Sequence, residues 1–302
     1  MAFNQAFFQS ASAADPMGTY GGFLAIGEGI EYLISPKRKK EVSLRLAIAR
    51  NENDLAKNLL REIPAETKII RISGNHLTVL DYAAYAKNAE IIKYMLDNDK
   101  DLMQRHNRKK GANEDSVFEF AIESGCFDCV KVLVQGGADV NRAAPYTPLQ
   151  LLLYSSYNKR FSRAETIELI SYLLENGADP NIFDAIPQGY RNSVLQYAII
   201  NGDLDIVDRL LKDERVVQLI THKNLEKRTA SGLMEDYLKS DSYFYSYSRS
   251  GYGTLTTAQK LQAKALSEKM KSLEAKAIRA AAEIEVKTDP ISTDSSSINN
   301  PQ

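Results

Sequence analysis

The chain has 302 residues, which is the length of about two ordinary domains. Lys and Arg total 38 and Asp and Glu total 39, so the net charge is −1, and this balance excludes a nucleic-acid or membrane binder that relies on bulk charge. Two cysteines exclude a disulfide-dense secreted scaffold. No apolar run approaches the ~20 residues of a bilayer span, and the N-terminus lacks the basic region of a secretory signal.

Residues 1–41 form an N-terminal segment that carries no Lys or Arg before Lys37. We expect apolar and aromatic side chains in residues 20–35 to cap the N-terminal end of the domain that follows. These side chains are Tyr20, Phe23, Leu24, Ile30, Tyr32 and Leu33.

A basic cluster, Lys37-Arg-Lys-Lys40, lies at the end of this segment and precedes a predicted helix. Short Lys/Arg runs act as nuclear-import signals. They also occur as the solvated ends of helices. Both interpretations of the cluster remain open at the level of sequence.

Residues 42–240 contain an internal repeat with helical periodicity. Five short stretches share an apolar pattern whose fourth residue serves as an anchor, and a second apolar helix follows each of them. In four of the five, a short turn lies four residues after the anchor, where glycine permits a left-handed backbone. The anchors are Ala47, Ala83, Ala121, Leu152 and Ala198, and the turn residues are Asn51, Lys87, Gly125 and Gly202.

Two repeats end in nearly identical sequences, Gly137-Ala-Asp-Val-Asn141 and Gly177-Ala-Asp-Pro-Asn181, and one begins with Thr147-Pro-Leu-Gln150. This pattern resembles the ankyrin-repeat family, in which a Thr-Pro-Leu-His-x-Ala start, a glycine between two helices and a Gly-Ala-Asp-x-Asn finger recur about every 33 residues. The resemblance covers roughly residues 42–220. It implies an all-α solenoid of about five repeats plus caps, in which stacking supplies the stability.

Hydroxyl side chains precede four of the predicted first helices, where they can accept a hydrogen bond from a backbone N–H group at the helix start. They are Thr78, Ser116, Thr147 and Ser193.

We expect a degenerate sixth unit, Leu225–Leu238, to cap the C-terminal end. Insertions in the finger 101–115 and at about 155–163 interrupt the repeat, and both carry positive charge.

Residues 241–253 form a Ser/Tyr/Gly-rich linker, and residues 254–286 are predicted to form one long helix that begins with a capping box of Thr256 and Gln259. Apolar residues spaced by three and four then make a heptad seam. The seam is compatible with a coiled coil that self-associates, with docking on the solenoid, or with a solvated helix. Residues 287–302 are polar, and we expect them to be disordered.

Few side chains offer catalytic chemistry. His76, His106 and His222 lie far apart and lack metal-ligand spacing, so we expect no metal site. Cys126-Phe-Asp-Cys129 is a CxxC motif at a helix start, where a thiolate can be stabilised, but Cys129 falls at a core position of the repeat and the favoured interpretation is structural. The sequence lacks a phosphate loop, a kinase motif set and an HExxH motif. We therefore expect neither an enzyme nor a cofactor.

The resemblance to ankyrin repeats implies that a partner binds in the concave groove of finger tips and first helices. We expect exposed tyrosines in this groove to act as hot spots. The positive insertions flank the groove, so we expect a partner protein with an acidic patch. The candidate residues are Tyr85, Ser124, Tyr146, Tyr154, Asn192 and Asn201 in the groove, and Arg105, Arg108, Lys109, Lys159, Arg160 and Arg163 in the insertions.

The predicted function is therefore non-enzymatic protein binding. Divergent ankyrin repeats with insertions and a helical tail resemble effectors that intracellular bacteria translocate into host cells, and scattered Glu followed by small polar residues resembles a type IV secretion signal. This resemblance implies a location in the host cytoplasm. Two alternatives remain: a eukaryotic adaptor or nuclear regulator, which the basic cluster favours, and an enzyme with an unrecognised site formed with the C-terminal helix.

Overall fold

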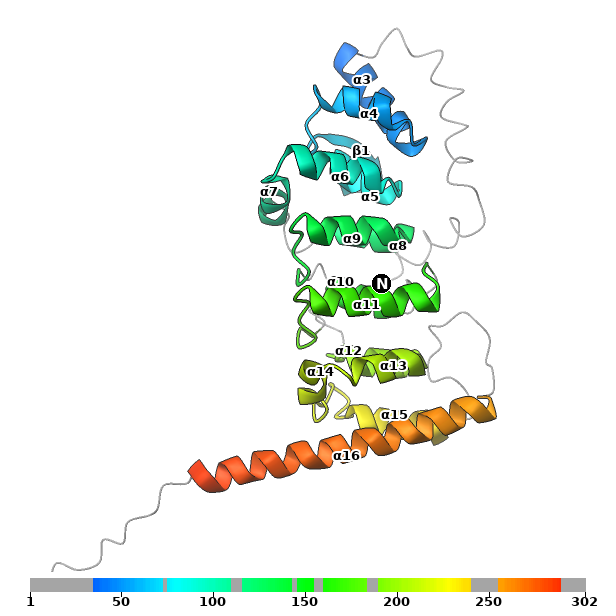
Figure 1. Ribbon diagram of the computed structural model, residues 1–302, viewed down its shortest axis with the longest axis vertical. Coiled ribbons are helices and arrows are strands. Elements are labelled where there is room, and N and C mark those ends of the chain that lie inside the picture. Colours follow the sequence, from blue (N-terminus) through cyan, green and yellow to red (C-terminus); the bar gives the residue numbers. More distant parts are fainter. Residues whose placement is uncertain are drawn as a thin grey trace, which may run out of the picture.

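The computed structural model of the protein describes residues 35–72, 75–109, 116–142, 146–154, 160–183, 190–239 and 255–288. Within these residues, helices pack in antiparallel pairs and the pairs stack into a single column (Figure 1). The structure confirms the predicted all-α solenoid. The expected N-terminal cap in residues 20–34, the linker 241–253 and the tail 289–302 lie outside the described residues.

Each pair consists of an inner and an outer helix, and each kind forms its own layer along the column. Inner helices contact the inner helices of neighbouring pairs, and outer helices do the same, so the core is continuous from end to end. The inner helices are α3 (Pro36–Ala49), α5 (Val79–Tyr85), α8 (Val117–Ser124), α10 (Pro148–Leu153), α12 (Val194–Ile200) and α15 (Ala230–Lys239). The outer helices are α4 (Asn53–Leu60), α6 (Ala89–Asn98), α9 (Phe127–Gln135), α11 (Arg163–Glu175), α13 (Leu204–Leu210) and α16 (Thr257–Thr288).

The remaining described elements lie in the connections between pairs. Strands β1 (Lys68–Ile72) and β2 (Asn75–Thr78) form an antiparallel hairpin before α5, with Arg71 opposite His76. Two short helices, α7 (Leu102–Lys109) and α14 (Glu214–Gln218), follow α6 and α13. The first positive insertion of the sequence therefore contains a helix of its own.

The inner helices begin where the sequence places a hydroxyl side chain. Thr78, Ser116, Thr147 and Ser193 are the N-caps of α5, α8, α10 and α12, and each accepts a hydrogen bond from the backbone N–H three residues later. At three of the four, the third helical residue also bonds back to the N–H of the cap residue, which completes a capping box. These bonds satisfy the free donors of a helix start and confirm the predicted starts.

The turn between an inner and an outer helix needs a residue with left-handed backbone. Asn51, Lys87, Gly125 and Gly202 all have positive φ, between 57° and 73°. Glycine avoids the steric penalty of this conformation. At Gly125 it has a second role, because a Cβ atom there would lie 2.7 Å from the carbonyl oxygen of Arg160 in the second insertion.

The two Gly-Ala-Asp-x-Asn sequences form neighbouring fingers that bond to each other. In each, the aspartate side chain accepts the backbone N–H of the asparagine two residues later, at 2.9 Å. The amide of Asn141 then donates to the carbonyl oxygen of Gly177 at 3.0 Å and accepts the N–H of Asp179 at 2.7 Å. The motif thus joins consecutive fingers by side-chain to backbone hydrogen bonds.

A sixth repeat closes the C-terminal end of the column. Helix α15 packs on α12 as an inner helix does, and α16 packs on α15 and α13 in the position of an outer helix. Ala263, Leu266 and Met270 are buried in this contact. Of the three alternatives left open by the sequence, docking on the solenoid is the one observed for the first part of α16.

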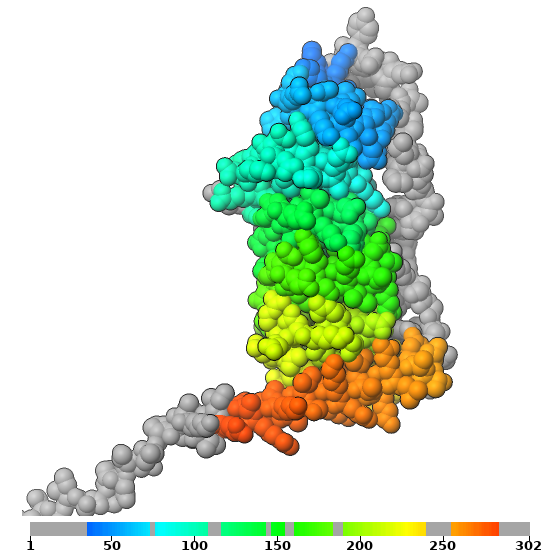
Figure 2. Space-filling model, viewed as in Figure 1, coloured from blue at the N-terminus to red at the C-terminus, as the bar shows by residue number. Residues whose placement is uncertain are grey.

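The second part of α16 projects past the column, as Figure 2 shows. Leu273 and Ala277 are half-buried, whereas Ile278 is 57% exposed and the residues after it, up to Glu283, are exposed. The helix runs to Thr288, two residues beyond the predicted end. Self-association through the seam remains a prediction for this projecting part.

The basic cluster Lys37–Lys40 lies inside the first helix. Ser35 is the N-cap of α3 and accepts the N–H of Arg38 at 3.3 Å, and Pro36 occupies the first helical position. The four cations therefore form the first turns of α3, whereas the sequence analysis placed them before the helix. They are exposed, and Lys40 forms an ion pair with Glu62, which agrees with the interpretation of the cluster as a solvated helix end.

Candidate functional site

Some polar side chains near the end of an inner helix bond to the inner helix of the preceding repeat, and two of them are predicted groove residues. The Ser124 hydroxyl donates to the carbonyl oxygen of Ala84 at 3.0 Å, and the side-chain amide of Asn201 donates to the carbonyl oxygen of Leu153. Asn88 makes the same kind of bond to Ile48 at 3.1 Å. Each acceptor follows an anchor, near the C-terminal end of an inner helix, where carbonyl groups lack an intrahelical donor. Ser124 and Asn201 are thus engaged in stacking the repeats.

Asn192 does not face solvent. It is buried, and its side-chain oxygen accepts a hydrogen bond from the amide of Asn224 at 3.0 Å. Asn224 in turn organises the last finger, since its side-chain oxygen accepts the N–H groups of Glu226 and Arg228. The expected partner contact at Asn192 is therefore replaced by an internal bond between the fifth and sixth repeats.

The predicted tyrosines remain partly exposed. Tyr146 lies just before α10 and Tyr154 just after it, and their rings pack together with centroids 4.9 Å apart. Both are half-buried, as is Tyr85 at the end of α5, whose ring lies 6.3 Å from that of Tyr82. We call Tyr85, Tyr146 and Tyr154 the tyrosine row. It keeps aromatic surface available at the ends of two inner helices.

The first insertion presents less free charge than its sequence indicates. Arg105 bonds to Asp99 at 3.0 Å through Nη1 and to Glu66 at 3.3 Å through Nε. The hydrogen bond from Arg105 to Asp99 lowers the pKa of that carboxyl group. The backbone of Arg108 and Lys109 belongs to α7, but the positions of their side chains are outside the described structure. At least one of the three predicted cations therefore serves to hold α7 in place.

His106 fixes α7 to the second repeat. Its Nε2 atom lies 3.5 Å from the carboxylate of Asp81, and both side chains are buried. Asp81 is the third residue of α5, a position at which Gln150 and Gln196 in later repeats donate to backbone carbonyl oxygens of the next finger. A carboxylate has no proton to donate, so at this repeat a histidine side chain in the next finger faces it instead.

The second insertion is described from Arg160 onward, and Lys159 lies outside the described residues. Arg160 is exposed, and Phe161 anchors the loop in the core. Arg163, the first residue of α11, bonds to Asp205 at 2.8 Å and lies 3.9 Å from Asp203. Burial raises the pKa of Asp203 to about 6, and the positive charge of Arg163 opposes this shift only in part.

The CxxC motif forms a disulfide between Cys126 and Cys129. Cys129 is fully buried, as its repeat position predicts. Cys126 is the N-cap of α9, where its sulfur accepts the N–H of Cys129 at 3.2 Å. The sequence analysis did not anticipate this bond, because the spacing alone does not distinguish two core thiols from a crosslinked pair.

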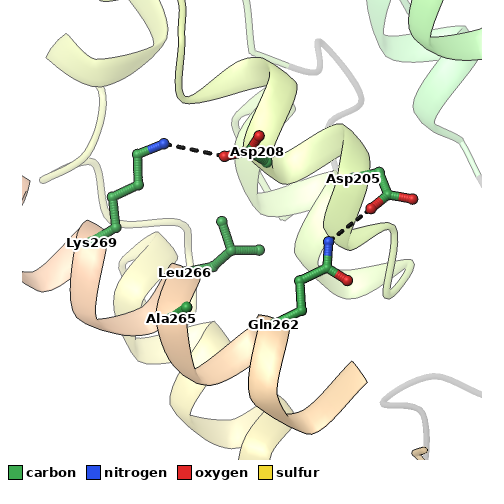
Figure 3. A pocket seen from close by; sticks show the side chains of 6 residues that line it. All are labelled: Asp205, Asp208, Gln262, Ala265, Leu266 and Lys269. Carbon is green, nitrogen blue, oxygen red and sulfur yellow. Dashed lines mark hydrogen bonds and ion pairs between the residues drawn. The ribbon is translucent and has the colours of Figure 1, made fainter. Parts of the chain in front are cut away.

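A groove of about 300 Å³ marks the seam between α13 and α16. Figure 3 shows Gln262 donating to Asp205 at 2.7 Å and Lys269 reaching Asp208 at 3.2 Å, with Leu266 between these contacts. Lys212 and Lys269 lower the pKa of Asp208 by hydrogen bonding to its carboxylate. The polar groups that line the groove hold α16 on the column.

The described part of the chain contains no group of three or more His, Cys, Asp or Glu side chains that could hold a metal ion. No helix among the described residues is both long and apolar enough to cross a bilayer.

The family model for ankyrin repeats (three copies) matches residues 28–144 of the chain. No curated protein matches the sequence. The match ends before α10, and three further helix pairs stack after it with inner and outer helices in the same order. Ankyrin repeats generally mediate protein–protein interaction and are typically not enzymatic.

Proposed function

We propose that the protein binds a partner protein through the inner-helix side of its column, with Tyr146 and Tyr154 at the centre of the contact. The observation that carries this proposal is the packed, half-exposed tyrosine pair. Tyrosine gives a large amphipathic contact area at low conformational entropy cost, which is why it is frequent among binding hot spots. The neighbouring polar side chains Ser124, Asn192 and Asn201 bond within the column, so the aromatic surface carries the recognition.

The preferred partner carries an acidic patch beside its apolar contact. Arg160 supports this, because it is exposed at the edge of the second insertion and the insertion loop lies against the turn at Gly125. Arg105 and Arg163 contribute less, since acidic side chains of the same chain already bond to them. Exposed charge of this kind raises association rates and sets salt dependence more than it raises affinity.

The proposal is tested by comparing the proteins that each variant captures from a host-cell lysate. Tyr146→Ala with Tyr154→Ala removes the aromatic surface, and Arg160→Glu reverses the exposed charge. Lys264→Glu, an equal charge reversal at an exposed site on α16, is the matched control. We expect one partner to bind wild type and K264E and to be lost from the tyrosine variant. Equal capture by all variants would falsify the assignment of the site.

We further propose that the protein is a host-directed bacterial effector delivered by a type IV-like system. The support is the resemblance of the sequence to such effectors and the polar C-terminal end that follows α16. Deleting residues 289–302 tests delivery, because this deletion leaves all of α16 intact. Loss of translocation into host cells with retained partner binding supports the proposal. Undiminished translocation contradicts it and favours the eukaryotic adaptor.

A further inference from the structure

The N-terminal end of the column presents an apolar face that the inner repeats do not have. Leu55 lies eight residues after the anchor of the first repeat. The corresponding residues of the second, third and fifth repeats, Ile91, Cys129 and Ile206, are at most 2% exposed, whereas Leu55 is 45% exposed. Leu59 is half-buried, although its counterparts in the same three repeats are buried. A layer that covers these positions elsewhere is therefore missing from the described residues here.

Helix geometry shows that this face points away from the second repeat. Asn53 and Lys57 of α4 both bond to Glu90 of α6, at 2.7 and 2.5 Å. Leu55 is two residues from each, which at about 100° per residue places it on nearly the opposite side of α4. Leu59 lies one turn further along that side.

Helix α3 adds a second apolar stripe to the same end. Its buried residues are Leu44, Ala47 and Ile48. Val42 and Leu46 each lie two positions from Leu44, so they share the opposite side of the helix, and both are half-buried. We call Val42, Leu46, Leu55 and Leu59 the N-terminal end face.

We propose that residues 20–34 of the same chain cover the N-terminal end face and act as the cap of the solenoid. The segment contains Phe23, Leu24, Ile30 and Leu33, so it brings apolar surface to match the face. It ends directly before α3, and its 15 residues span up to about 50 Å when extended, more than the roughly 21 Å length of that helix. An occupant tethered this closely has a high effective concentration at the face.

Charge supports the same occupant. Residues 1–34 contain Asp15, Glu28 and Glu31 and no Lys, Arg or His. Arg38 lies one turn before Val42, on the side of α3 that carries the apolar stripe. The acidic segment and the basic start of α3 therefore attract each other.

A double-mutant cycle in the full chain tests the proposal. Leu55→Asp changes the face, and replacement of Phe23, Leu24, Ile30 and Leu33 by Ser changes the segment. Leu225→Asp, at a leucine that is 61% exposed near the other end, is the matched control. Leu55→Ala repeats the cycle with a milder change. Unfolding temperature, hydrogen exchange in α3 and α4, and molar mass by light scattering are measured for each.

We expect L55D and the segment variant each to lower the unfolding temperature by about 5 °C and to speed exchange in α3 and α4. Their combination should cost little more than either alone, because both break the same contact. Additive effects, or an effect of L55D no larger than that of L225D, overturn the proposal. A dimer that dissociates in L55D but not in the segment variant also overturns it, since a second copy then covers the face.

Discussion

At the scale of single residues, much of the polar surface expected to recognise a partner is used to stack the repeats. Ser124 and Asn201 satisfy carbonyl groups of the preceding inner helix, and Arg163 bonds to an aspartate of the next outer helix. Polar atoms near a helix end are drawn into such bonds because a buried carbonyl without a donor is costly. Tyr85, Tyr146 and Tyr154, at neighbouring positions, stay partly exposed.

Asp203 gives the stability of the protein a pH dependence that one substitution removes. Its pKa is raised to about 6 in the folded chain, above the ordinary value of an aspartate. Protonation therefore favours folding, so its stabilising contribution is complete below about pH 4 and is lost as the pH rises through 6. We expect Asp203→Asn to match wild type near pH 4 and to be more stable at pH 7, by on the order of 2–3 kcal/mol. Urea unfolding at both pH values measures this, and an equal difference at the two contradicts it.

The two cysteines allow a matched comparison, since substituting either removes the disulfide. Cys126→Ser keeps an N-cap side chain that accepts the helix-start N–H, and serine is a preferred cap. Cys129→Ser places a hydroxyl in the core, where burial without a partner costs about 1–3 kcal/mol. We expect C129S to have the lower free energy of unfolding by about that amount. Equal stability of the two variants would show that the position of Cys129 in the core is unimportant.

At the scale of elements, a buried contact between His106 and Asp81 helps to hold the inserted helix α7 in place. His106→Ala removes this contact from the buried carboxylate of Asp81, and losing one partner of a buried polar group costs about 1–3 kcal/mol. We expect lower stability and faster hydrogen exchange in α7. Asp81→Asn in the same chain should restore part of the loss, because it removes the carboxylate charge while the amide oxygen can still accept the hydrogen bonds from Thr78. No recovery in the double variant would contradict a pairing role for His106.

The C-terminal helix is an integral part of the solenoid, so the site of a truncation decides its effect. Removing residues 255–302 exposes the surfaces of α13 and α15 that Ala263, Leu266 and Met270 cover. Removing residues 289–302 leaves that contact intact. We expect the longer deletion to lower the unfolding temperature by more than about 5 °C or to cause aggregation, and the shorter one to have no effect. Thermal unfolding followed by circular dichroism distinguishes these outcomes.

At the scale of the whole molecule, each repeat touches only its neighbours, so stability should vary along the column. Middle repeats have a neighbour on both sides, whereas each end has one. We therefore expect amide exchange to be slowest in α8, α9, α11 and α12 and faster in α4 and α15. Hydrogen exchange followed by mass spectrometry measures the gradient. Uniform protection along the column would show that it unfolds as a single unit.

The sequence by itself determined the repeat, because its signals are local. A capping hydroxyl, a left-handed turn residue and a small anchor each act within one repeat, so Thr78, Gly202 and Ala198 mark the helices without knowledge of their neighbours. It also identified Cys129 as a core residue and the tyrosine row as partner-facing candidates.

Only the tertiary structure decided which side chains remain available and where the C-terminal helix lies. Asn192 and Arg163 look free in sequence, but their partners Asn224 and Asp205 come from the next repeat, 32 or more positions along the chain. The heptad seam of α16 fits a second helix as well as a solenoid end, and the first part of the seam packs against the apolar sides of α13 and α15. Contacts between repeats depend on how the repeats stack, and no local pattern encodes them.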